Sequence, residues 1–143
     1  LPDRYETGTQ NTPGIAGLSA GVNVVLQEGT KHIHQREWEL VQQLMEGLIR
    51  IPGVRLLGPA LGREKTGIVS FVMDHMDPSQ TAFLLDRNYK IAVRSGYHCT
   101  PLSHQTVGTE ATGAVRASVG FYTTADDVEY FIAAVTEIVD QGT

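Results

Sequence analysis

The sequence has a single cysteine, Cys99, in 143 residues, so no disulfide can form within the chain. That scarcity is typical of proteins in a reducing compartment. Basic residues are not in surplus, because eleven Lys and Arg face sixteen Asp and Glu and leave a formal net charge of −5. A dedicated nucleic-acid-binding protein would be expected to show a basic footprint. No apolar run approaches the roughly 20 residues of a membrane-spanning helix, and no N-terminal secretory signal is present. We therefore expect a cytoplasmic protein that binds neither nucleic acid nor membrane.

What is present is the composition of a folded domain, with 41% hydrophobic and 19% charged residues. The first residue is Leu1 rather than Met, which we interpret as a chain cut from something longer or processed. Residues 1–14 are rich in Pro, Gly, Thr and Asn and predict an extended arm.

Two helices are predicted next. Residues 13–28 carry apolar side chains at steps of three and four, with Pro13 in the first turn and Gly29 as a stop. A second helix follows Thr30, which can cap it, and Pro52 marks its end. Its apolar stripe predicts a buried face and comprises Ile33, Leu40, Val41, Leu44, Met45, Leu48 and Ile49.

The remaining pattern alternates short strands with helices. We expect strands at residues 54–57, 67–73, 91–93 and 115–119. Residues 78–88 predict a helix with Phe83 and Leu84, and as a further candidate Leu85, facing the core, and a last helix begins after Thr124, with Asp127 at its third position. This order predicts a small two-layer α+β domain with a short, mostly antiparallel sheet covered by helices on one face.

Residues 94–113 do not follow the packing pattern, yet they hold the only cysteine. A lone cysteine is often a small buried hydrophobe. Cys99, however, follows a predicted strand, beside His98 and five residues after Arg94. Because positive charge near a thiol favours its thiolate, we interpret Cys99 as a candidate nucleophile. His98 could tune or protonate it or simply belong to the loop, and His104 is interpreted as loop structure.

Arg116 interrupts an otherwise apolar strand. It can be an outward-facing residue of an alternating strand, or a planar fork that receives a carboxylate through two parallel hydrogen bonds. A metal site is not expected. His32 and His34 are alternate residues and do not share a helix face, while Cys99, His98 and His104 fall short of a closed zinc site.

Several short motifs follow one another along the chain, at residues 4–11, 13–18, 94–99, 115–118 and 121–124. In this order they together resemble the C-terminal part of a cysteine desulfurase of the class V aminotransferase-like family, whose members are fold type I pyridoxal phosphate (PLP) enzymes. The Arg-x-Gly-x-His-Cys form at residues 94–99 is similar to the group of Suf-pathway enzymes and selenocysteine lyases.

The resemblance implies that Cys99 attacks the sulfur of L-cysteine and carries it as a persulfide while alanine is released. Arg116 would grip the substrate carboxylate, with Arg94 as a second donor. Thr9, beside Gly8, would reach the cofactor phosphate of the opposite subunit, which implies a homodimer. A sulfur-acceptor protein and a role in sulfur metabolism and iron–sulfur cluster assembly are also implied.

The family's Schiff-base lysine belongs to a large domain, and Lys31, Lys65 and Lys90 lie in no matching context. We therefore expect residues 1–29 to be a connecting arm and helix, residues 30–143 to be the small domain, and the PLP-binding domain to lie outside this chain, which alone would be inactive. The alternatives are a selenocysteine lyase or another class V transaminase relative, and a non-catalytic sulfur-relay or binding module.

Overall fold

The structure is a computed structural model that describes residues 4, 5 and 7–142. These residues form two compact units, one ending at Ile33 and the other beginning at His34. The division lies within the helix α2 (Thr30–Leu48). The expected arm at residues 1–14 lies partly outside the described residues. That residues 1–29 connect to a small domain at residues 30–143 stays a prediction.

The first unit contains α1 (Thr12–Glu28), which confirms the predicted helix to within one residue. Asn11 caps it, since its side-chain oxygen accepts a hydrogen bond from the Gly14 amide at 3.1 Å. Gly29 ends it with a φ of 78°, a conformation that glycine adopts without steric cost. None of the residues of α1 is buried. Five of its large apolar side chains are at least 43% exposed, namely Ile15, Leu18, Val22, Val25 and Leu26, while Val24 is half-buried.

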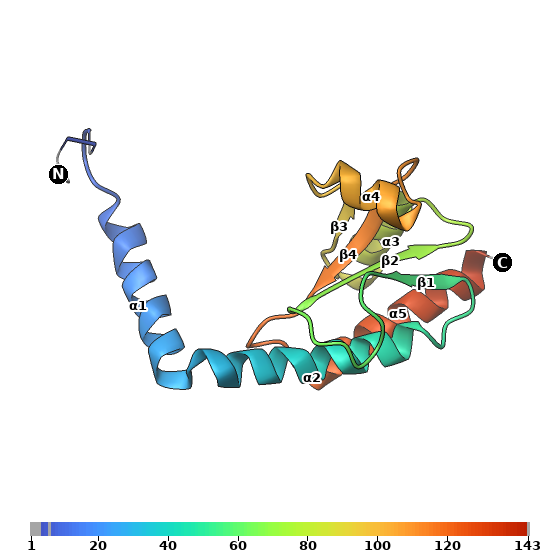
Figure 1. Cartoon of the computed structure of the whole chain (residues 1–143), viewed down its shortest axis with the longest axis horizontal. Coiled ribbons are helices and arrows are strands. Elements are labelled where there is room, and N and C mark those ends of the chain that lie inside the picture. Colours follow the sequence, from blue (N-terminus) through green and yellow to red (C-terminus); the bar gives the residue numbers. More distant parts are fainter. Residues whose placement is uncertain (1–3, 6, 143) are drawn as a thin grey trace. The chain divides into compact units, whose positions relative to one another are not determined.

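The second unit is an α+β domain around a four-stranded sheet (Figure 1). The strands are β1 (Val54–Leu57), β2 (Ile68–Met73), β3 (Arg94–Gly96) and β4 (Ala114–Ser118), in the order β1-β2-β4-β3. Every neighbouring pair is antiparallel. The predicted α+β class with an antiparallel sheet is confirmed, although helices lie on both faces of the sheet rather than on one.

The core lies between one face of this sheet and the helices α2, α3 (Pro78–Tyr89) and α5 (Ala125–Gly142). Phe71 of β2 is fully buried and meets the ring of Phe131 of α5 edge to face, with centroids 6.1 Å apart. Burial of a side chain of this size stabilises the fold by about 1.5–3 kcal/mol. Thr124 and Asp127 each bond to the other's backbone amide, which confirms the predicted start of α5.

One strand was predicted in the wrong place. Residues 91–93 form no strand, because α3 continues to Tyr89 and its end is closed by Lys90, in the left-handed conformation, and by a bond from the Ile91 amide to the Leu85 carbonyl at 3.1 Å. The chain reaches the sheet only at Arg94.

Two predicted core positions are also wrong. Phe83 is 57% exposed, while Leu85 is fully buried, because Thr81 and Leu85 lie one turn apart on the inward face of α3. Ile49 is 58% exposed, since α2 ends at Leu48 and the chain turns there. Leu84 packs partly buried against the core, as expected.

Residues 94–113 are more regular than expected, because they contain β3 and a short helix, α4 (Pro101–Val107). Pro101 suits the first turn of α4, where its missing N–H needs no partner. The helix lies across the sheet from α5 (Figure 1), and Arg55 of β1 donates a hydrogen bond to the Val107 carbonyl at 3.4 Å.

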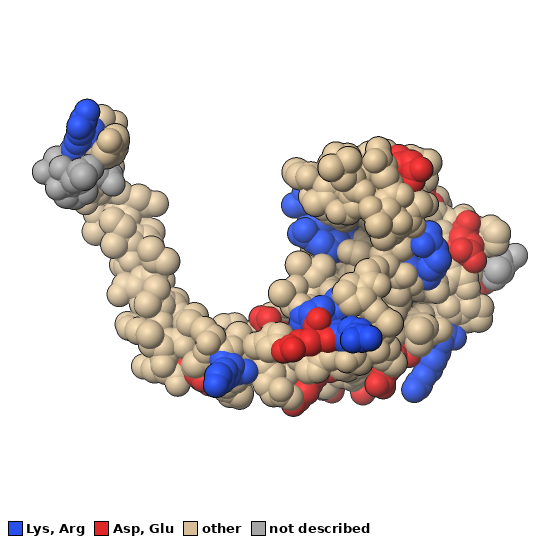
Figure 2. All heavy atoms as spheres, in the orientation of Figure 1, with Lys and Arg blue, Asp and Glu red and all other residues tan. Residues whose placement is uncertain are grey.

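The surface carries charges of both signs. On the face of the second unit drawn in Figure 2, Lys and Arg are interspersed with Asp and Glu. Within the described part of the chain, no helix is both long enough and apolar enough to cross a bilayer.

Candidate functional site

The site lies on the face of the sheet that turns away from the main core. Side chains alternate between the two faces along a strand. Phe71 of β2 and Val115 of β4 point into the core, so Ser70 and Arg116 point to the other face. Ser70 pairs with Arg116, and Arg116 pairs with Arg94 of β3. One row across three strands therefore brings a hydroxyl and two guanidinium groups to the same surface.

Arg116 and Arg94 are directly opposite each other on neighbouring strands. Like charges in this position destabilise a sheet unless something offsets them. Arg94 is exposed and Arg116 is half-buried. The Nε of Arg116 is buried and has no hydrogen-bond partner among the described residues. A carboxylate placed here would satisfy that N–H and relieve the repulsion between the two cations.

A cavity of about 290 Å³ adjoins Arg116. The sheet contributes Ser70, the turn after β3 contributes His98 and Thr100, and α4 contributes His104. Cys99 lies in the same turn, and its side chain is exposed. The interpretation of Cys99 as a buried hydrophobe is therefore wrong, and the structure shows an accessible thiol between His98 and Thr100, two residues that line the cavity.

The turn that carries Cys99 has an unusual backbone. His98 and Cys99 have φ values of 51° and 61°, both in the left-handed region that side-chain-bearing residues rarely adopt. The carbonyl of Tyr97 accepts hydrogen bonds from the amide and the hydroxyl of Thr100, each at 2.9 Å. The Tyr97 hydroxyl donates to the carbonyl of Glu110 at 2.5 Å. Our reading of the sequence did not single out Tyr97 and Thr100, whose contribution depends on their contacts.

His98 is electrostatically distinctive. Its partial burial lowers the pKa of the imidazole below the ordinary value, and the nearby positive charges of Arg116 and Arg94 act in the same direction. A backbone hydrogen bond with Arg94 opposes these effects. Its Nε2 is buried and has no partner among the described residues. The lowered pKa favours the uncharged form of the His98 imidazole.

The remaining predicted residues lie elsewhere in the chain. Gly8 and Thr9 precede α1 in the first unit, and both are exposed. The φ of Gly8 is 83°, and no atom lies within 4 Å of where a Cβ would be. These observations describe an open backbone at this position, while the role of both residues at a cofactor phosphate stays a prediction.

The histidines of α2 bind separate carboxylates. His32 contacts Glu28 at 3.1 Å, and His34 contacts Glu64 at 2.8 Å. Among the residues that the structure describes, no three His, Cys, Asp or Glu side chains are grouped so as to hold a metal ion.

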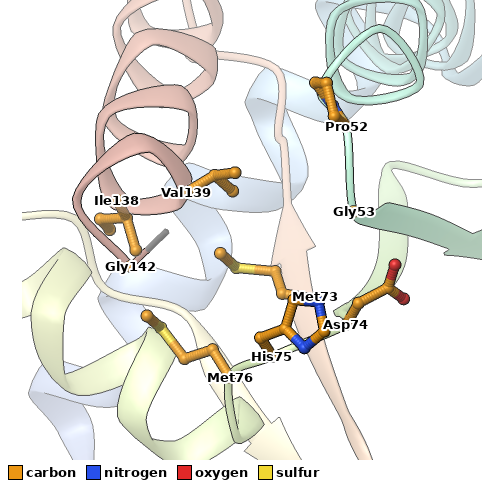
Figure 3. A pocket seen from close by; sticks show the side chains of 9 residues that line it. All are labelled: Pro52, Gly53, Met73, Asp74, His75, Met76, Ile138, Val139 and Gly142. Atoms are coloured by element: carbon orange, nitrogen blue, oxygen red, sulfur yellow. The ribbon is translucent and has the colours of Figure 1, made fainter.

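Another cavity, of about 260 Å³, lies at the end of α5 (Figure 3). Its walls are mostly apolar and include Met73, Met76 and Ile138, with His75 and Asp74 at one side. None of the buried, unpaired polar atoms of the described residues lines it. We therefore place the candidate functional site beside Arg116.

The geometry defines a class of protein: an α+β domain with an exposed thiol on a turn whose neighbouring residues line a cavity with Arg116, which is suited to a small carboxylate. Residues 1–131 match the family model Aminotransferase class-V, and the chain belongs to this family.

The relatives sharpen this assignment. The chain is 41% identical over 137 residues to a probable cysteine desulfurase of Xylella fastidiosa, a match that covers 96% of this chain and 32% of that protein. It is 37% identical over 139 residues to probable cysteine desulfurase 2 of Mycobacterium leprae, again covering 32% of the relative. The chain thus spans about a third of the length of the curated relatives it matches.

The fold matches solved structures of the same kind. The apo cysteine desulfurase of Thermococcus onnurineus superposes with a TM-score of 0.85 at 35% identity, over 98% of this chain and 34% of that one. A cysteine desulfurase of Escherichia coli gives a TM-score of 0.83 at 26% identity, over 100% of this chain and 34% of that one. The chain corresponds to the C-terminal domain of these enzymes.

Proposed function

We propose that this chain is the part of a PLP-dependent cysteine desulfurase that supplies the sulfur-accepting thiol and binds the substrate carboxylate. Cys99 as thiolate attacks the sulfur of L-cysteine, an S–S bond forms as the C–S bond breaks, and the electron pair of that bond stays with the carbon. Protonation of that carbon gives alanine, and Cys99 is left as a persulfide.

One observation carries the proposal: the exposed Cys99 lies on a turn between His98 and Thr100, which line the same cavity as Arg116, and the Nε of Arg116 has no partner among the described residues. A planar guanidinium receives a carboxylate through two parallel bonds, and Arg94 adds a second cation. The lowered pKa of His98 favours its uncharged form, and we propose that this imidazole, next to Cys99 in the chain, takes the thiol proton. A free amino acid such as cysteine therefore finds both an anchor and an acceptor.

The residues present fit the substrate end of such a site. When bound, PLP would supply an electron sink that weakens the C–S bond. None of the three lysines of the sequence lines the cavity beside Arg116, and Lys90 donates to the carbonyl of Arg87 at 3.0 Å. We propose that the lysine that anchors PLP belongs to a large domain outside these 143 residues, with Thr9 and Gly8 contacting the phosphate across a homodimer.

The decisive variant is Cys99→Ala in the full-length enzyme. We expect it to bind PLP as the parent does but to release no sulfide from L-cysteine, because no thiol remains to take the sulfur. Sulfide and alanine are measured in the presence of a reductant. Gln105→Ala, an exposed neighbour on α4, is the matched control and should keep full activity. Unchanged sulfide release by Cys99→Ala would refute the assignment, and a relay module would show no cysteine consumption in the parent enzyme.

A further inference from the structure

His104 is the buried histidine of α4, and both of its ring nitrogens are engaged. Its Nε2 lies 3.0 Å from the carbonyl oxygen of Tyr97, and its Nδ1 lies 2.7 Å from the hydroxyl of Thr109. A carbonyl oxygen only accepts, so Nε2 carries the proton and donates it to Tyr97, while the Thr109 hydroxyl donates to Nδ1. The ring also meets the Tyr97 ring edge to face, with centroids 5.2 Å apart.

These bonds join three pieces of the chain at the base of the cysteine turn. Tyr97 directly follows β3, His104 belongs to α4, and Thr109 lies in the connection from α4 to β4. The amide of Thr109 also donates to the carbonyl of His104 at 2.9 Å. Between Tyr97 and α4 lie His98 and Cys99 in their left-handed conformations. Such a backbone persists only where its surroundings hold it, and His104 provides a bond across the turn.

We propose that His104 is a positioning residue for Cys99. By bonding to Tyr97 on one side and Thr109 on the other, its imidazole holds the turn in the left-handed conformation that exposes the thiol between His98 and Thr100, two residues that line the cavity beside Arg116. The expected effect of His104 on catalysis rests on the proposed function. Its effect on the conformation of the turn rests only on the hydrogen bonds to Tyr97 and Thr109.

The structural part is tested by amide hydrogen exchange on the 143-residue chain. His104→Gln places an amide N–H close to the position of Nε2 and retains the donor to Tyr97, while His104→Asn reaches only the Nδ1 position. We expect His104→Asn to speed exchange at the Thr100 amide by about fivefold, as for a lost hydrogen bond. His104→Gln should stay within about twofold of the parent. His75→Gln, at an exposed histidine between β2 and α3, is the control.

A substitution of Thr109, which bonds to Nδ1 of His104, distinguishes the loss of a hydrogen bond from misfolding of the chain. Thr109→Val keeps the bond to Tyr97 and removes the hydroxyl, so it should give an intermediate increase. Equal exchange in parent and His104→Asn would overturn the proposal, as would equal acceleration in His104→Asn and His104→Gln, because the bond to Tyr97 would then not matter.

The catalytic part is tested in the full-length enzyme. Because Arg116 and Arg94 hold the carboxylate independently of the turn, His104→Asn should lower kcat for sulfide release by about fivefold or more, with KM for cysteine little changed, and His104→Gln should recover most of the loss. Faster exchange with unaltered kcat would overturn the positioning role. If the parent released no sulfide at all, the proposed function would fail, while the exchange experiment would still decide whether His104 holds the turn.

Discussion

At the scale of single residues, the paired arginines dominate the chemistry. Arg94 and Arg116 lie opposite each other on neighbouring strands, a costly arrangement that an anion would stabilise. His98 and Cys99 adopt left-handed conformations in the adjoining turn. Electrostatic repulsion and backbone strain at one place are typical of functional sites, because both lower the stability of the fold.

The role of Arg116 predicts a loss of substrate binding. Arg116→Ala in the full-length enzyme should raise KM for cysteine by roughly 10- to 150-fold, which corresponds to about 1.5–3 kcal/mol for hydrogen bonds to a charged group. Arg116→Lys should recover only part of the loss, because an ammonium lacks the planar fork. Arg63→Ala, at an exposed arginine between β1 and β2, is the control. An unaltered dependence of rate on substrate concentration in Arg116→Ala would contradict the assignment.

The lowered pKa of His98 predicts an acid-sensitive fold. Since the pKa is lower in the folded chain than in the unfolded one, the unfolded chain binds more protons as the pH falls below the ordinary histidine value of about 6.5, and stability then decreases. His98→Gln should therefore lose less stability than the parent between about pH 7.5 and pH 5.5. Urea denaturation at both pH values measures this. Gln105→Ala should behave like the parent, and an equal loss in His98→Gln would show the expectation to be wrong.

At the scale of elements, the site depends on how closely β3 approaches β4. A Cβ added to Gly113, at the start of β4, would lie 2.4 Å from the carbonyl carbon of Gly96 at the end of β3. Gly113 also has a φ of 76°. Only glycine allows the two backbones to meet here, and this contact brings Arg94 opposite Arg116.

Gly113→Ala is expected to destabilise the fold by roughly 1–3 kcal/mol, because the backbone of β3 cannot shift without losing its pairing. Urea denaturation measures the free energy of unfolding. Gly120→Ala is the matched control, since no atom lies within 4 Å of its Cβ position, and its effect should stay within about 0.5 kcal/mol. Equal effects of the two substitutions would contradict the close approach.

Across the whole molecule, the chain spans about a third of its curated relatives, and none of its lysines lines the cavity beside Arg116. The isolated 143-residue chain is expected to bind PLP weakly or not at all and to show no turnover. An absorption titration with PLP measures this, with the full-length enzyme as the positive control. An absorbance band of lysine-bound cofactor in the isolated chain, lost on substitution of one lysine, would contradict the expectation.

Elements with a strong periodic pattern and clear ends could be predicted from the sequence. The helices at residues 13–28 and after Thr124 have both, and the structure confirms them. The strand at residues 91–93 was wrong because its apolar residues suit a strand or the end of a helix equally, and only the closure of α3 by Lys90 excludes the strand. The short α4 was missed because seven residues with one buried side chain give no periodic signal.

The order of residue types along the chain alone determined the candidate thiol, the candidate guanidinium groups and the family, because these depend on local motifs. Only the tertiary structure decided that Arg94 lies opposite Arg116, that Cys99 is exposed, and that His104 contacts Tyr97 and Thr109. Strand register and the packing of α4 on the sheet set these relations. The Arg94–Arg116 pairing joins residues distant in sequence, and the contacts of His104, although close in sequence, depend on how α4 packs, which no periodic pattern encodes.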